Sequence, residues 1–66
     1  MDFTEKAQIR IKHWLSHNET HIKEYETFAH ELENTHKNES ARQIREMSAL
    51  MEQCNECLRL TLKALD

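Results

Sequence analysis

The chain has 66 residues with a formal net charge of −3, and it contains neither glycine nor proline. This length allows one small domain with little core, and the two missing residue types argue against tight β-hairpins and glycine-rich phosphate loops. The sequence has no basic stretch and no long apolar run, and its first residues show no apolar stretch resembling a signal peptide. We therefore expect no nucleic-acid partner and no membrane span, and we expect a cytoplasmic protein.

The remaining composition favours helices, and we expect a single all-α helical-hairpin domain over residues 1–66. Its predicted elements are a first helix at about 2–36, a turn at about 37–39 and a second helix at about 40–65. Both helices are long enough to pack along most of their length.

The predicted helix ends rest on short capping patterns. Asp2 and Glu5 have the spacing of a capping box at the start of the first helix. Asn38 is expected to take the left-handed conformation that ends a helix when glycine is missing. Ser40 and Gln43 have the spacing of a second capping box, at the start of the second helix.

Apolar faces recur with a period close to seven along both predicted helices, which is typical of long helices packed side by side. The first face consists of Ile11, Trp14, Leu15, Asn18, His21, Ile22, Tyr25, Phe28, Ala29 and Leu32. The second face consists of Ala41, Ile44, Met47, Ser48, Met51, Cys54, Asn55, Leu58, Thr61, Leu62 and Leu65. An antiparallel hairpin would place residues opposite each other when their numbers sum to about 75. Because a single hairpin leaves half of each apolar face exposed to solvent, we predict a homodimer that forms a four-helix bundle.

Two histidines and two cysteines are the candidate metal ligands. His17 and His21 are four residues apart, so their side chains lie over one another on a helix. The predicted register brings Cys54 opposite His21 and Cys57 near His17, and two imidazoles with two thiolates suit Zn²⁺, or else Ni²⁺ or Co²⁺. The alternative is a boundary histidine, a hydrogen-bonded interior histidine and cysteines that act as small hydrophobic residues. This alternative leaves the protein without a cofactor, which we favour over any single metal. His13 is expected to face water.

Asn18, Tyr25 and Asn55 form the predicted polar core, since all three fall on apolar faces. A polar residue at a core position of a helical bundle often fixes register and partner number, which is the structural interpretation of the two asparagines. The functional alternative is a small polar pocket at the bundle centre, to which His21 also contributes.

The pattern HW-x2-HN-x2-H-x3-Y-x3-A, from His13 to Ala29, is followed by N-x2-L at Asn55 and Leu58. Together they resemble a family of small uncharacterised prokaryotic helical-hairpin proteins, associated with nickel and cobalt handling genes that include cobaltochelatase-like ones. The residues that the resemblance implicates are Trp14, His17, Asn18, His21 and Tyr25, with Asn55 opposite. The chain lacks the turn glycine of that family and carries two cysteines of its own. The resemblance therefore implies a site centred on histidine and asparagine rather than on thiolates.

Enzyme signatures are missing, including H-E-x-x-H and a pair of E-x-x-H motifs. We therefore expect a non-enzymatic, self-associating protein, with a transition-metal site around His17 and His21 as an added hypothesis. One alternative is a structural or adaptor module that binds a partner helix through its apolar face without metal. A less favoured alternative is a thiol-dependent redox protein that uses Cys54 or Cys57.

Overall fold

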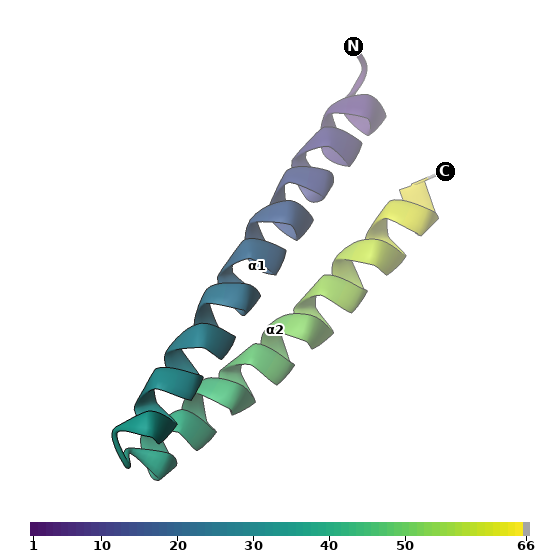
Figure 1. Cartoon of the computed structure of the whole chain (residues 1–66). Coiled ribbons are helices and arrows are strands. Elements are labelled where there is room, and N and C mark those ends of the chain that lie inside the picture. The colour runs from purple at the N-terminus through teal and green to yellow at the C-terminus, as the bar shows by residue number, and fades with distance from the viewer. Residues whose placement is uncertain (66) are drawn as a thin grey trace.

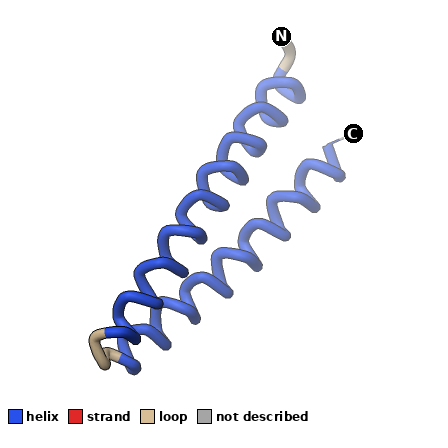
Figure 2. The backbone as a smooth tube through the Cα atoms, viewed as in Figure 1, coloured by secondary structure: helices blue, strands red, loops and turns tan. Residues whose placement is uncertain are grey.

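The computed structural model describes residues 1–65, and all the regular structure in this part of the chain is helical. Helix α1 comprises Phe3–Asn34 and helix α2 comprises Asn38–Leu65 (Figure 1). The chain reverses direction between them, so that the start of α1 and the end of α2 lie at the same end of the hairpin (Figure 2). The predicted all-α helical hairpin is confirmed. Neither helix combines the length and the apolar character needed to span a membrane.

The start of α1 is capped by Asp2. Its backbone is extended, and its side chain accepts a hydrogen bond of 2.9 Å from the backbone N–H of Glu5. This bond satisfies one of the N–H groups that every helix leaves unpaired in its first turn. It also places a carboxylate at the positive end of the helix dipole. The helix therefore begins at Phe3, directly after the predicted cap.

The turn between the helices lies at residues 35–37, slightly earlier than predicted. His36 is the left-handed residue, with a φ of 63°. Its N–H donates to the carbonyl of Glu33 at 3.0 Å, and the next N–H donates to the carbonyl of Leu32 at 2.8 Å. This pair of bonds is the Schellman arrangement, in which glycine is usual but histidine is among the residues that tolerate positive φ. The left-handed conformation predicted for Asn38 was therefore wrong.

Helix α2 begins ahead of the predicted capping box. The N–H of Ala41 donates to the carbonyl of Lys37 at 3.0 Å, which closes the first turn of the helix. Ser40 consequently lies inside this first turn rather than before it, and the capping role predicted for it was wrong. In the same turn Glu39 pairs with the guanidinium of Arg42, and its negative charge suits the N-terminal end of the helix dipole.

The seam between the helices is lined by small and polar residues. Its buried hydrophobic members are Ile11, Ala29 and Ala41, and its buried polar members are Ser48 and Asn55. Three of these follow one another at intervals of seven along α2, as the predicted heptad pattern requires. The fully buried part of the seam is therefore narrow, and the positions beside it on both helices are only half-buried.

A hydrogen bond between two asparagines sets the register of the hairpin. The Asn18 amide nitrogen Nδ2 donates to Asn55 Oδ1 at 2.9 Å across the seam. The numbers of this pair sum to 73, whereas we predict about 75 for opposite residues. At the observed register His21 lies level with Glu52 rather than with Cys54.

The hairpin is one elongated layer with dimensions of 51 × 16 × 10 Å. Its radius of gyration is 15.4 Å, whereas a compact chain of this length would have a value of about 11 Å. Trp14, Phe28 and Met47 stay partly exposed as a result. A single hairpin does not cover these three side chains, although their helical spacing predicts core positions.

Candidate functional site

A row of three histidines and a tyrosine runs along α1 at intervals of four residues. The rings of His13 and His17 are stacked with centroids 6.0 Å apart. The rings of His17 and His21 meet edge to face with centroids 4.4 Å apart, and the ring of Tyr25 is stacked on His21 at 5.9 Å. The row follows from helix geometry, because residues four apart share a face.

His17 and His21 are the closest pair in this row. The two Nε2 atoms are 2.9 Å apart, and His21 Nδ1 lies 3.3 Å from the carboxylate oxygen Oε2 of Glu24. A carboxylate only accepts hydrogen bonds, so His21 Nδ1 carries the proton, and in the neutral ring the Nε2 lone pair is directed at His17. With His21 in this tautomer, His17 Nε2 is the donor in the 2.9 Å contact. Glu24 thus fixes which nitrogen of His21 is available to a ligand.

The two cysteines do not join this pair. Cys54 and Cys57 are free thiols, and both are exposed. No group of three or more His, Cys, Asp or Glu side chains within residues 1–65 is arranged to hold a metal ion. One hairpin therefore brings together His17 and His21 but does not assemble them with the cysteines into the predicted four-ligand site. The reason is that Cys54 precedes the seam residue Asn55 and turns about 100° away from the seam.

The polar core consists of the asparagine pair and its neighbours. Asn55 is 0% exposed, and its Nδ2 atom has no hydrogen-bond partner. The hydroxyl of Ser48, one heptad earlier, is also buried without a partner. Asn18 is only part-buried, so water can reach its amide. Tyr25, the third predicted member, packs on the histidine row rather than hydrogen-bonding with the asparagines in this structure.

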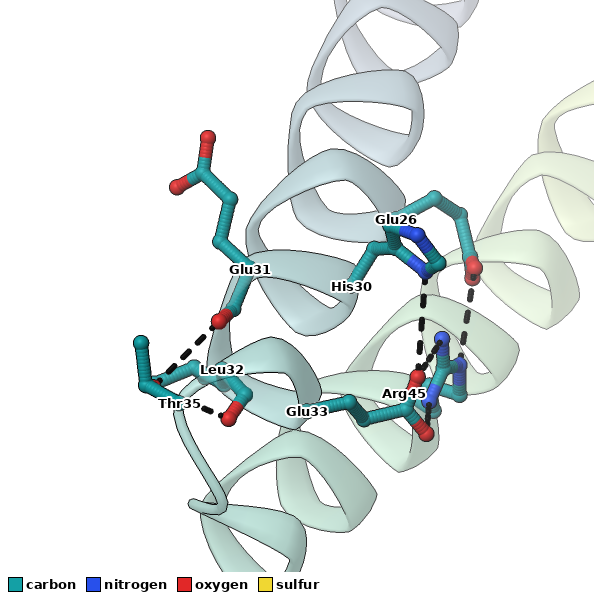
Figure 3. A network of polar contacts seen from close by, with 7 residues as sticks. All are labelled: Glu26, His30, Glu31, Leu32, Glu33, Thr35 and Arg45. Carbon is teal, nitrogen blue, oxygen red and sulfur yellow. Dashed lines mark hydrogen bonds and ion pairs between the residues drawn. The ribbon is translucent and has the colours of Figure 1, made fainter.

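A cluster of ion pairs joins the two helices near the turn (Figure 3). Arg45 Nη2 donates to Glu33 Oε1 at 3.0 Å, and Arg45 Nε lies 3.7 Å from Glu26. His30 Nδ1 lies 3.9 Å from the same Glu33 carboxylate. The hydrogen bond from Arg45 holds the pKa of Glu33 below its usual value, and Glu33 in turn raises the pKa of Arg45.

Sequence reasoning did not find this cluster. In the sequence alone, the charged residues of both helices are typical of solvated helix faces with ion pairs within one helix. The pairing of Arg45 with Glu33 and Glu26 depends instead on the register across the hairpin. The useful signal was that Glu26 and Glu33 are seven residues apart, so both lie on one stripe of α1 beside α2.

The charges of α2 are confined to one side of the helix. All eight lie on three of the seven heptad stripes: Glu39, Arg42, Arg45, Glu46, Glu52, Glu56, Arg59 and Lys63. The other four stripes carry no charge over the whole length of α2, and we call them the uncharged sector. They consist of Ala41, Ser48, Asn55 and Leu62; Ile44, Met51, Leu58 and Leu65; Ser40, Met47, Cys54 and Thr61; and Gln43, Leu50, Cys57 and Ala64. These four stripes span about 200° around the axis of α2. This arc is wider than the part of the α2 surface that packs against α1.

The two long faces of the hairpin differ in chemistry. At 100° per residue, Trp14, His21 and Phe28 fall on the side of α1 that continues into the uncharged sector of α2. Arg45, which pairs with α1 carboxylates, falls on the opposite side of the seam. One face is therefore apolar with a row of histidines at its edge, and the other is bridged by ion pairs.

Comparison with known proteins identifies the family of the chain. A family model described as a domain of unknown function, DUF8180, matches residues 7–65. The match covers nearly all of both helices, which agrees with the expected small uncharacterised family. No curated protein and no solved structure matches the chain.

Proposed function

The chain belongs to the DUF8180 family of unknown function, and we propose that it is a small, non-enzymatic, self-associating protein. Two hairpins pack through the uncharged sector of α2 to form a four-helix bundle. Trp14 and Phe28 of α1 extend the same contact surface. The observation that carries the proposal is the width of the uncharged sector, which exceeds what one neighbouring helix can bury.

The exposed area supports a partner of this size. The hairpin exposes 5130 Å², whereas a compact monomer of 7.9 kDa would expose about 4,400 Å². The excess is about 700 Å², and a standard interface buries about 800 Å² on each partner. Covering the apolar face with a second hairpin would therefore bring the exposed area of each chain close to that of a compact monomer of the same mass.

The absence of charge supports a second copy as the partner. In a two-fold contact the same patch meets itself, so a charged patch would oppose its own charges. The uncharged sector avoids this repulsion along the whole of α2. An unrelated partner helix is the alternative, and in that case the protein would be an adaptor module.

The test compares two leucines of α2 that are exposed to a similar degree. Leu50 is 60% exposed inside the uncharged sector, and Leu60 is 57% exposed on a stripe that carries charges. We expect sedimentation equilibrium at micromolar concentration to give twice the chain mass for the wild type and for Leu60→Glu. Leu50→Glu should sediment as a monomer, because it places two buried carboxylates in the interface of a dimer.

A second measurement keeps the test valid if the monomeric variant is poorly folded. The urea midpoint of a dimer rises with protein concentration, whereas that of a monomer does not. The midpoint should depend on concentration for the wild type and for Leu60→Glu, and it should do so less for Leu50→Glu. A folded wild-type monomer at micromolar concentration would refute self-association and support the adaptor alternative.

Two further parts of our expectation belong to this proposal. The cytoplasm is its proposed location, because two exposed free thiols stay reduced there. The nickel and cobalt association is a proposal supported by the His17 and His21 pair. A redox role for the thiols has less support, because Cys54 and Cys57 also fit as small hydrophobic residues of the uncharged sector.

A further inference from the structure

We propose that His17 and His21 together bind one divalent transition-metal ion, with nickel or copper favoured over zinc. Both ligands belong to a single helix, so this site goes beyond self-association and does not depend on it. The pair is exposed at the edge of the apolar face, so the remaining coordination positions are open to water. Carboxylate-poor ligation of this kind also disfavours Mg²⁺ and Ca²⁺, which prefer oxygen ligands.

The spacing of the two histidines brings both nitrogens within reach of one ion. Imidazole nitrogens bind first-row metals at about 2.0–2.1 Å, so two ligands of one ion lie about 2.9–3.3 Å apart. The Nε2 atoms of His17 and His21 are 2.9 Å apart, which is also the length of the hydrogen bond between them. Small turns of the two side chains therefore bring both lone pairs onto one ion. Zinc sites in proteins normally have three or four protein ligands, whereas this pair supplies two, so an ion that keeps several waters, such as Ni²⁺ or Cu²⁺, is favoured.

Glu24 supplies the outer partner that metal-binding histidines normally have. Ligating histidines usually donate their second ring N–H to a carboxylate or carbonyl, which orients the ring and makes it a better ligand. His21 Nδ1 lies 3.3 Å from Glu24 Oε2, while its Nε2 faces His17. The His21 ring is therefore already in the tautomer that binding requires.

Binding needs a change of tautomer in His17 and a small turn of both rings, because the two Nε2 atoms face each other rather than a shared ion. In the metal-free protein His17 Nε2 donates to His21, so that nitrogen carries the proton. Metal binding needs the lone pair on the same atom, so the proton of the neutral ring moves to Nδ1 by way of water. The net protonation of the two rings does not change.

The chain contains a matched control for this site. His30 has a carboxylate three residues later, Glu33, just as His21 has Glu24. His30 has no histidine four residues away on either side. It therefore reproduces the orienting carboxylate without the second ligand, and His30→Ala should leave metal binding unchanged.

The experiment is calorimetric titration of the full chain with Ni²⁺ alone. We expect one ion per chain, with affinity reduced more than tenfold in His17→Ala and in His21→Ala. Loss of an outer partner typically costs about 10- to 100-fold, so Glu24→Gln should weaken binding about tenfold. Zn²⁺ should bind the wild type more weakly than Ni²⁺.

The monomeric variant separates this inference from the proposed function. Leu50→Glu should still bind one Ni²⁺ per chain, whether or not the wild type is a dimer. Binding that disappears in Leu50→Glu would overturn a site built on one helix. Equal losses in His30→Ala and His21→Ala, or no binding of Ni²⁺ at millimolar concentration, would overturn the inference as well.

Discussion

Replacing Asn18 with alanine should destabilise the protein more than replacing Asn55, although Asn55 is the more buried of the two. Asn18→Ala removes the hydrogen bond and leaves Asn55 Oδ1 buried without a partner, which costs about 1–3 kcal/mol. The better helix propensity of alanine offsets about 0.5 kcal/mol. We therefore expect the free energy of unfolding to fall by about 1.5 kcal/mol.

Asn55→Ala loses the same hydrogen bond, but a second, stabilising effect offsets part of this loss. It also removes the Nδ2 group that is buried without a partner, and it leaves the amide of Asn18 where water can reach it. The expected loss is about 0–1 kcal/mol. Urea unfolding followed by circular dichroism, at one fixed protein concentration, measures both variants. If Asn55→Ala costs about 1 kcal/mol more than Asn18→Ala, the reasoning from unsatisfied polar groups is refuted and burial alone decides.

Two further predictions concern the turn and the ion pairs. His36→Gly should raise the free energy of unfolding by about 1 kcal/mol relative to His36→Ala, because glycine adopts positive φ without a steric penalty; equal urea midpoints would contradict this. Arg45→Ala should lower stability at neutral pH and do so less in acid. The pKa of Glu33 is lowered in the folded protein, so its contribution is present above the usual glutamate pKa and is lost as the pH falls through the lowered value. A difference in urea midpoint between wild type and Arg45→Ala that stays constant from neutral pH to pH 3 would contradict the pairing.

The heptad spacing was enough to predict the hairpin and to place Asn18 and Asn55 on the faces that meet. Asn18 and Asn55 are the polar residues at core positions of their faces, and the structure joins them by a hydrogen bond. Asp2 was predictable for the same reason, because a cap depends only on residues three apart. The same local spacing predicted a cap at Ser40 that the structure does not have, because α2 begins two residues earlier.

Features that depend on the exact register between the two helices could not be predicted from the sequence. The turn could close at several positions, and the sequence offered no glycine to fix it, so His36 was not identified. The observed register also differs from the predicted one by two residues, and this difference separates His21 from Cys54. Cys54 was placed on the apolar face of the second helix and Cys57 was not, and both thiols are exposed because one hairpin does not bury the whole of that face.

The short connection at residues 35–37 has a consequence for the order of folding. Successive layers of the seam lie seven residues further from the turn along both helices. The hairpin can therefore form layer by layer, starting at the turn. Closing each new layer lengthens a loop that is already closed, which costs little entropy. The Asn18 and Asn55 bond, which spans 37 positions in the sequence, would then form after the layers nearer the turn. Backbone amides near the turn should accordingly exchange with solvent deuterium most slowly, and those at the open end of both helices most quickly.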